Sequence, residues 1–151
     1  LIPTATVITP NRSEAEVLAD MSIDCESDIT TAANRILQDL GPQVVIIKGG
    51  HIGEDATDYA FTKDGDIHTW TSPKYDTVHT HGTGCTFSAV ITAELAKGRD
   101  VMEAIGIAKN YIALAIKHNP ALGNGCGPVN HMAYGLLTNG PQTMDELLKN
   151  E

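Results

Sequence analysis

Apolar residues in the first half of the chain form two short runs with a helical stripe between them. Residues 7–9 predict a strand that ends at Pro10. The β-branched run at residues 44–47 predicts a strand buried on both faces of a parallel sheet. Between the two, apolar side chains follow the spacing of a helix that stops at Gly41: Ile29, Ala33, Ile36, Leu37 and Leu40. Strands that alternate with helices are typical of a layered α/β fold with a mostly parallel sheet.

The second half of the chain predicts a hairpin followed by two helices. Strand patterns at residues 57–62 and 66–71 flank an Asp-Gly turn, and this hairpin is expected at the periphery of the fold. A helix that begins at Thr83 or Cys85 is expected to pack antiparallel to a helix that Asp100 caps.

The junction after the first strand is polar. Ser13 is expected to cap the helix that follows, with Glu16 completing a capping box. Asn11 and Glu14 then lie where the strand passes into the helix. They either complement the helix dipole as ordinary first-turn residues or supply oxygen ligands for Mg²⁺ through water. Spacing alone favours the structural role.

Glycine-rich polar stretches follow the other strands. Lys48 and Gly49 end the buried strand, and residues 82–85 precede a helix. Ligands of open α/β sheets bind beyond the carboxyl ends of the strands, so we expect these stretches and the Asn11 junction to gather at one edge. Lys48 is then either an exposed cation or a phosphate ligand.

The turn that carries Cys85 is the most informative feature. The first amides of a helix carry partial positive charge, and Gly82 and Gly84 let the backbone approach an anion. The same field favours a thiolate at Cys85. A small buried core residue is the alternative for a single cysteine. The glycines favour an anion site, which indicates phosphoryl transfer.

A zinc site is an alternative for the neighbouring histidines. His79, His81 and Cys85 are local ligands, and His131 or Cys126 would have to supply the fourth. Because only three ligands are local, we expect the histidines to be phosphate donors or groups that fix a loop. Nothing in the sequence around Cys25 or Cys126 activates a thiol.

Charge and composition exclude several classes of partner. The 151 residues are 42% hydrophobic and carry a formal charge of −9, so nucleic acid and anionic membranes are poor partners. No apolar stretch reaches the roughly 20 residues of a membrane helix. Three widely spaced cysteines fit a reducing cytoplasm better than a disulfide framework.

Four motifs together resemble the hydroxymethylpyrimidine/phosphomethylpyrimidine kinases of thiamine biosynthesis, which belong to the ribokinase-like superfamily. Their order and approximate spacing match, and the resemblance covers residues 1–138, which leaves 139–151 as a C-terminal tail. The motifs are Thr9-Pro10-Asn11 with Glu14, Lys48-Gly49-Gly50-His51, the stretch at residues 79–85, and Gly127-Pro128-Val129-Asn130-His131.

The resemblance implies a three-layer α/β fold with helices on both faces of the sheet, and a kinase that uses ATP and Mg²⁺. Its substrates would be the small molecule hydroxymethylpyrimidine and then its monophosphate. By this analogy Cys85 is the catalytic residue, and Glu14 binds Mg²⁺ through water. The anion hole would consist of Gly82, Thr83 and Gly84, and the nucleotide or phosphate ligands would be Lys48, Gly49, Thr80 and Asn11.

The glycine-rich N-terminal half of the family has no counterpart in this sequence. The chain opens on a core strand without an initiator Met. We therefore expect the C-terminal, nucleotide-side portion of the kinase, with a fold incomplete at its N-terminus and little or no activity by itself. The resemblance is compatible with a homodimer.

Two other functions stay open. A pyridoxal or pyridoxine kinase uses the same thiol-bearing loop on a different heteroaromatic alcohol. A non-catalytic module that binds nucleotide or pyrimidine belongs to another class. Ligand-dependent stabilisation without release of ADP would identify such a module.

Overall fold

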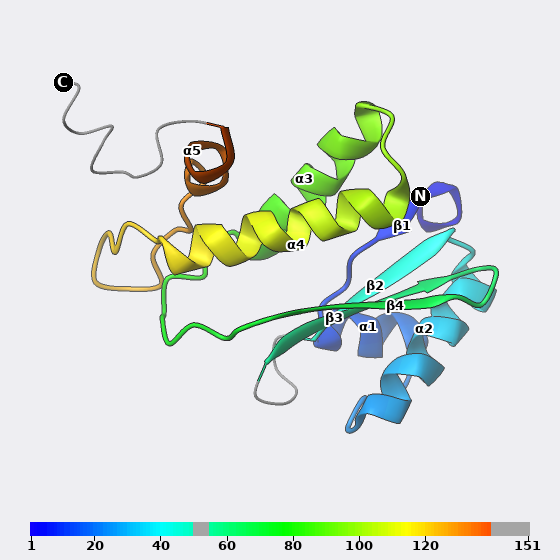
Figure 1. Ribbon diagram of the computed structural model, residues 1–151. Coiled ribbons are helices and arrows are strands. Elements are labelled where there is room, and N and C mark those ends of the chain that lie inside the picture. The colour runs from blue at the N-terminus through cyan, green and yellow to red at the C-terminus, as the bar shows by residue number, and fades with distance from the viewer. Residues whose placement is uncertain (50–54, 140–151) are drawn as a thin grey trace, which may run out of the picture. The chain divides into compact units, whose positions relative to one another are not determined.

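The computed structural model describes residues 1–49 and 55–139 (Figure 1). The chain divides into two compact units, Leu1–Lys74 and Tyr75–Glu151. The described elements of the first unit are η1 (Ile2–Thr4), β1 (Val7–Ile8), α1 (Arg12–Ala19), α2 (Glu26–Leu40), β2 (Val44–Gly49), β3 (Ala56–Thr62) and β4 (Ile67–Ser72). Those of the second unit are α3 (Thr83–Ala96), α4 (Val101–Lys117) and α5 (Ala133–Asn139).

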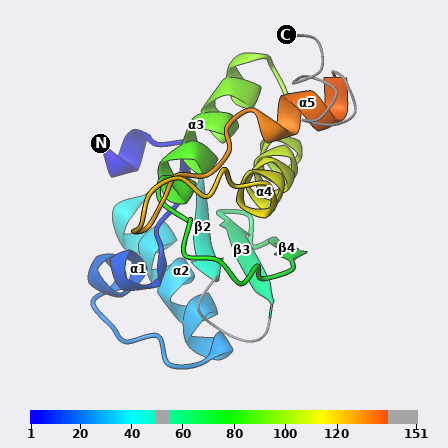
Figure 2. The ribbon, with the colours of Figure 1, turned by 90° about the vertical axis from the view of Figure 1, so that its left-hand side faces the viewer.

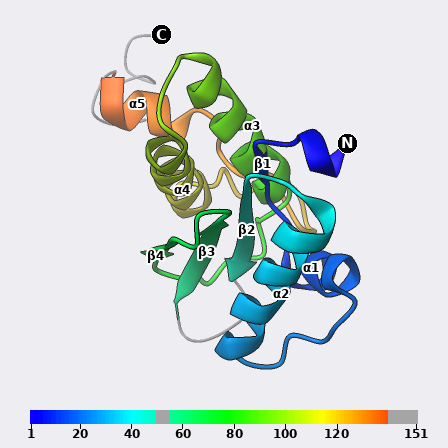
Figure 3. The same ribbon diagram turned by 90° about the vertical axis from the view of Figure 1, so that its right-hand side faces the viewer.

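The first unit is built on a sheet with the strand order β1-β2-β3-β4 (Figure 3). β1 and β2 are parallel, with Val7 opposite Val44, whereas the β2–β3 and β3–β4 pairs are antiparallel. The expected α/β class is confirmed, but among the described strands the sheet is mixed rather than mostly parallel. The reason is that the links before and after β3 are too short for the crossover that parallel neighbours require.

Of the two hairpin strands, only β4 lies at the periphery of the sheet, as expected, whereas β3 lies inside it. β3 pairs along the whole of β2, and its Phe61 is 2% exposed. β4 lies at the edge of the sheet and is largely exposed. The expected turn is present, with Gly65 at φ 92°, a backbone conformation that favours glycine. The hairpin therefore contributes one strand to the core, which the sequence pattern did not indicate.

Helices α1 and α2 cover one face of this sheet (Figure 3). The predicted stripe of α2 is buried apart from its last member, Leu40, which is partly buried, and α2 ends at Gly41 in the left-handed conformation with φ 78°. Burying an Ile or Leu side chain completely stabilises a fold by about 1.5–3 kcal/mol. The buried core of this unit consists of Ala15, Ala19, Ile23, Ile29, Ala32, Ala33, Ile36, Leu37, Val45, Ile47 and Phe61.

Helix α1 begins at a different residue from the one that the sequence predicts. Its N-cap is Asn11, and Glu14 closes the capping box, so the prediction that Ser13 and Glu16 form this box is wrong. Asn and Ser cap helices about equally well, and the reciprocal bonds between Asn11 and Glu14 decide between them. Glu16 instead accepts a hydrogen bond from the Ile23 amide at 3.0 Å.

The second unit is helical in its described part, and α3 packs against α4 (Figure 2). The helices join through apolar side chains that the predicted stripes contain, including Phe87, Ile91, Ile105 and Ala108. Both predicted helices are therefore confirmed. In the part of the chain that the structure describes, no helix is both long enough and apolar enough to span a membrane.

Candidate functional site

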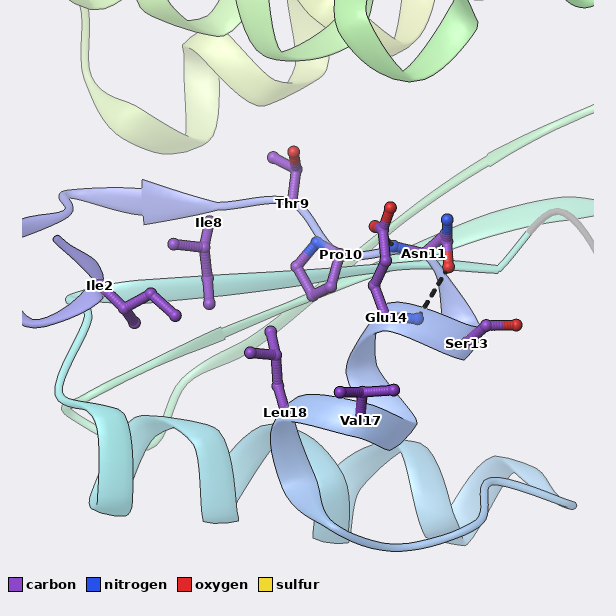
Figure 4. Close-up of a pocket in the computed structure, with 9 residues that line it drawn as sticks. All are labelled: Ile2, Ile8, Thr9, Pro10, Asn11, Ser13, Glu14, Val17 and Leu18. Atoms are coloured by element: carbon purple, nitrogen blue, oxygen red, sulfur yellow. Dashed lines mark hydrogen bonds between the residues drawn. The ribbon is translucent and has the colours of Figure 1, made fainter.

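Asn11 and Glu14 hold each other at the start of α1. The Asn11 Oδ1 atom accepts from the Glu14 amide at 2.9 Å, and the Glu14 Oε2 atom accepts from the Asn11 amide at 2.7 Å (Figure 4 shows the first of these bonds). The two residues therefore have the structural role that spacing favoured. The Glu14 side chain is exposed, and its second carboxylate oxygen, Oε1, takes no part in these two bonds.

A hollow of about 620 Å³ lies beside this junction (Figure 4). Asn11, Ser13 and Glu14 form its polar end, and the remaining wall is mostly aliphatic. The lining residues are Ile2, Ile8, Thr9, Pro10, Asn11, Ser13, Glu14, Val17 and Leu18. Sequence analysis missed Val17 and Leu18, although two apolar residues on a short amphipathic helix were the available signal.

Lys48 lies next to Asn11. The Lys48 amide donates to the carbonyl of Pro10 at 3.1 Å, and Asn11 and Lys48 form a parallel bridge beyond the paired part of β1 and β2. The structure thus brings together two of the predicted site residues at the carboxyl ends of parallel strands. The third polar stretch, residues 82–85, belongs to the second unit, so its place at the same edge stays a prediction.

Gly49 has a structural reason to be glycine. A Cβ atom on Gly49 would lie 1.8 Å from the carbonyl oxygen of Thr57 on β3. The Gly49 amide donates to the buried carboxylate of Asp58 at 3.2 Å, so this amide is already engaged. Its predicted contact with nucleotide is untested. Gly50 and His51 of the same motif lie outside the described residues.

The turn before α3 has the geometry that the glycines predict. Gly82 is the N-cap with φ 88°, and no side chain in the described part of the molecule caps this helix. The Thr83 amide donates to the Thr80 carbonyl at 3.3 Å. By helix geometry the next two amides, those of Gly84 and Cys85, have no acceptor within the helix. They are therefore suited to an outside anion.

Cys85 is exposed at this turn, so its interpretation as a buried core residue is wrong. A Cβ atom on Gly82 would meet no atom within 4 Å, which leaves open space next to the backbone. The uncapped amides, the open space and the positive end of the helix dipole together fit an anion such as a phosphate group.

Cys126 is a group that sequence analysis underestimated. Its Sγ atom lies 3.8 Å from the Thr80 hydroxyl. Thr80, through its backbone first and then through its hydroxyl, and the backbone of His81 hold the pKa of the exposed Cys126 thiol below its ordinary value. The fold therefore favours the thiolate of Cys126, which the neighbouring residues in the sequence do not indicate. These contacts join residues 46 apart, so no local sequence signal announces them.

The histidines of the zinc alternative have other partners. His79 Nδ1 accepts from the Gly127 amide at 3.2 Å, and His131 Nε2 lies 3.1 Å from the Thr86 hydroxyl. Within residues 1–49 and 55–139, no group of three or more His, Cys, Asp or Glu side chains is placed to hold a metal ion. These contacts favour the expectation that the histidines fix a loop.

The sequence matches a known enzyme family. The family described as phosphomethylpyrimidine kinase matches residues 1–130. A hydroxymethylpyrimidine/phosphomethylpyrimidine kinase of Staphylococcus aureus (strain MRSA252) is 51% identical over 136 residues, which cover 89% of this chain and 49% of the relative. The enzyme of the same name from Haemophilus influenzae is 48% identical, with coverages of 91% and 52%. The chain therefore spans about half the length of the curated relatives it matches.

Solved structures of related kinases have the same fold. The ADP complex of Bacillus subtilis pyridoxal kinase matches with a TM-score of 0.83 and 44% identity, covering 89% of this chain and 53% of the other. Staphylococcus aureus pyridoxal kinase in complex with AMP-PCP gives a TM-score of 0.83 and 38% identity, with coverages of 89% and 50%. Phosphomethylpyrimidine kinase from Clostridium difficile 630 gives a TM-score of 0.63 and 37% identity, covering 76% of this chain and 45% of the other. The expected ribokinase-like fold is confirmed.

Proposed function

The chain belongs to the phosphomethylpyrimidine kinase family, and we propose that it carries the phosphate-transfer residues of an ATP-dependent kinase of thiamine biosynthesis. The substrates of this kinase are 4-amino-5-hydroxymethyl-2-methylpyrimidine and its monophosphate. The names of the curated relatives, at 44% to 51% identity, support this choice of substrate.

The observation that carries the proposal is the exposed thiol of Cys85 at the uncapped start of α3. We assign Cys85 the place beside the hydroxyl that is phosphorylated. The turn of Gly82, Thr83 and Gly84 forms the anion hole for the transferring phosphoryl group. Because the Thr83 amide bonds to the Thr80 carbonyl, its outward donors are the amides of Gly84 and Cys85. Catalysis then consists largely of positioning and charge neutralisation, which is usual for phosphoryl transfer.

The remaining site residues bind the nucleotide and its metal ion. ATP supplies the phosphoryl group when bound, and Mg²⁺ neutralises part of its charge. We assign Lys48 to the phosphates, together with Asn11, Thr80 and Gly49. The exposed carboxylate of Glu14 keeps one oxygen outside the capping box, which suits a contact to Mg²⁺ through water.

Pyridoxal is the second candidate substrate. The observation in its favour is the TM-score of 0.83 with two pyridoxal kinases, against 0.63 with the phosphomethylpyrimidine kinase from Clostridium difficile 630. A shared fold alone does not choose between two heteroaromatic alcohols. The names of the curated relatives support the pyrimidine instead.

A chimeric enzyme tests the proposal. Residues 1–138 of this chain replace the matching region of the Staphylococcus aureus relative, and ADP release is measured with hydroxymethylpyrimidine and with pyridoxal. We expect turnover of the pyrimidine, and we expect Cys85→Ser to lose most of kcat while ATP binding is retained. Cys25→Ser, at the N-cap of α2, is the matched control and keeps full activity.

Three results would count against it. Equal turnover by the Cys85→Ser chimera would remove Cys85 from the mechanism. Faster turnover of pyridoxal would favour the second candidate. ATP binding by the chimera without ADP release from either substrate would favour the non-catalytic module.

The setting of the protein is also part of the proposal. Three exposed free cysteines suit a reducing compartment, and we propose a cytoplasmic location. The partner is the small-molecule substrate. A homodimer is proposed as well, and light scattering on the purified chain tests it.

A further inference from the structure

The segment at residues 127–131 is hydrogen-bonded to the turn that precedes α3. The His81 amide donates to the Gly127 carbonyl at 3.1 Å, and the Val129 amide donates to the His81 carbonyl at 3.4 Å. The Gly127 amide donates in turn to His79 Nδ1. These bonds form a short parallel bridge between His81 and Pro128.

The same segment reaches into the first turn of α3 through one side chain. His131 Nε2 lies 3.1 Å from the hydroxyl of Thr86, the residue directly after Cys85. Thr86 is 8% exposed, and its amide donates to the Gly82 carbonyl at 2.9 Å, which closes that first turn. A contact on Thr86 therefore acts on the backbone on either side of Cys85.

The backbone of His131 is held by α4. Its carbonyl accepts from the Tyr111 hydroxyl of α4. The backbone amide of the neighbouring Asn130 donates to the Ala115 carbonyl, and its side-chain Nδ2 donates to the His118 carbonyl, both at 2.9 Å. The segment thus connects the C-terminal part of α4 with the start of α3 through hydrogen bonds.

We propose that His131 is a positioning residue, which fixes Cys85 and the first amides of α3 by holding the Thr86 hydroxyl. The start of α3 needs such support because Gly82 and Gly84 are the least restrained of residues and because, among the described residues, no side-chain cap holds the turn. The imidazole touches Thr86 and acts on Cys85 only through it. This assignment deepens the proposed function and rests on it for the identity of the bound anion.

Replacements of His131 in the full 151-residue chain test the assignment. His131→Leu removes the polar partner, whereas His131→Gln places an amide where Nε2 lies. We expect amide hydrogen exchange of Thr86 and Phe87 to become roughly tenfold faster in His131→Leu and to stay near the wild-type rate in His131→Gln. Amides of α2 in the first unit are the internal reference and should not change.

Binding of inorganic phosphate, followed by NMR at the Gly84 and Cys85 amides, is the second readout. We expect a Kd roughly tenfold higher in His131→Leu and rescue in His131→Gln. Thr86→Val, which removes only the hydroxyl, should match His131→Leu and serves if that variant does not fold. The double variant should be no worse than either single one, because replacing both partners leaves no buried group unpaired.

Two results separate the inference from the proposed function. Unchanged exchange at Thr86 and Phe87 in both His131→Leu and Thr86→Val would overturn the positioning role. A wild-type chain that binds neither phosphate nor ATP would contradict the proposed function, and the exchange rates would still decide on His131.

Discussion

Replacing Gly127 by alanine tests how closely the segment at residues 127–131 is fitted to the turn before α3. Gly127 is buried, and a Cβ atom there would lie 2.3 Å from His79 Nδ1 and 2.7 Å from the Leu122 carbonyl oxygen. Real Cβ contacts are not this short, so the ring or the backbone must move. Overpacking of this kind costs about 1–3 kcal/mol. Loss of the bond to His79 adds about 1 kcal/mol, which gives roughly 2–4 kcal/mol in total.

Urea unfolding of the full chain, followed by circular dichroism, measures this loss as a lower midpoint with an unchanged slope. Gly125→Ala is the matched control in the same loop, because a Cβ atom there would meet nothing within 4 Å. We expect it to change the free energy of unfolding by less than about 0.5 kcal/mol. Adding His79→Ala to Gly127→Ala should recover part of the loss, because it removes one of the two close contacts. Equal stability of the Gly127→Ala and Gly125→Ala variants would refute the reasoning.

Three further predictions concern the first unit. Asn11→Ala should lower the free energy of unfolding by about 1 kcal/mol through loss of the cap, while Ser13→Ala should change it little, and urea unfolding of both variants checks this. Burial first, and then the hydrogen bond to Glu26, raise the pKa of Tyr59 to about 12. The stabilisation is therefore complete below pH 10.0 and is lost as the pH rises towards 12. Ultraviolet titration should show that the Tyr59 phenolate forms at a higher pH than in a free tyrosine, and at a lower pH in Glu26→Gln than in the wild type. Hydrogen bonds from the Asp24 amide first, then from the Cys25 side chain and amide, hold the pKa of Asp28 below 3.8. The stabilisation is therefore complete above pH 3.8 and is lost as the pH drops further. The urea concentration at the unfolding midpoint should decrease in that range, and it should decrease less in Asp28→Asn.

Local patterns were sufficient for most elements of the fold. The stripe of α2 and its glycine stop, the strand at residues 44–47 and the Asp-Gly turn each depend on neighbours in the sequence, and all are present. The choice of partner strand depends on tertiary contacts. The pattern therefore could not reveal that β3 pairs along the whole of β2 and places Phe61 in the core.

The candidate site shows the same limit. The Asn11 cap was missed because Ser13 has a similar preference for that position, and the reciprocal bond with Glu14 decides between the two. The glycine at position 49 suggested an anion site, but close approach to the Thr57 carbonyl is reason enough for it. The contact between Cys126 and Thr80 joins two distant parts of the second unit, so only the folded chain displays it.

Calorimetric titration of the full chain with ATP and excess Mg²⁺ tests the central claim most directly. The account predicts saturable binding at one site. Lys48→Ala should weaken it at least roughly tenfold, as expected for a charged hydrogen-bond partner of a phosphate. The matched control is Lys63→Ala, at the exposed turn between β3 and β4, and it should bind like the wild type. No saturable binding by a folded chain, or equal binding by the Lys48→Ala variant, would contradict the account.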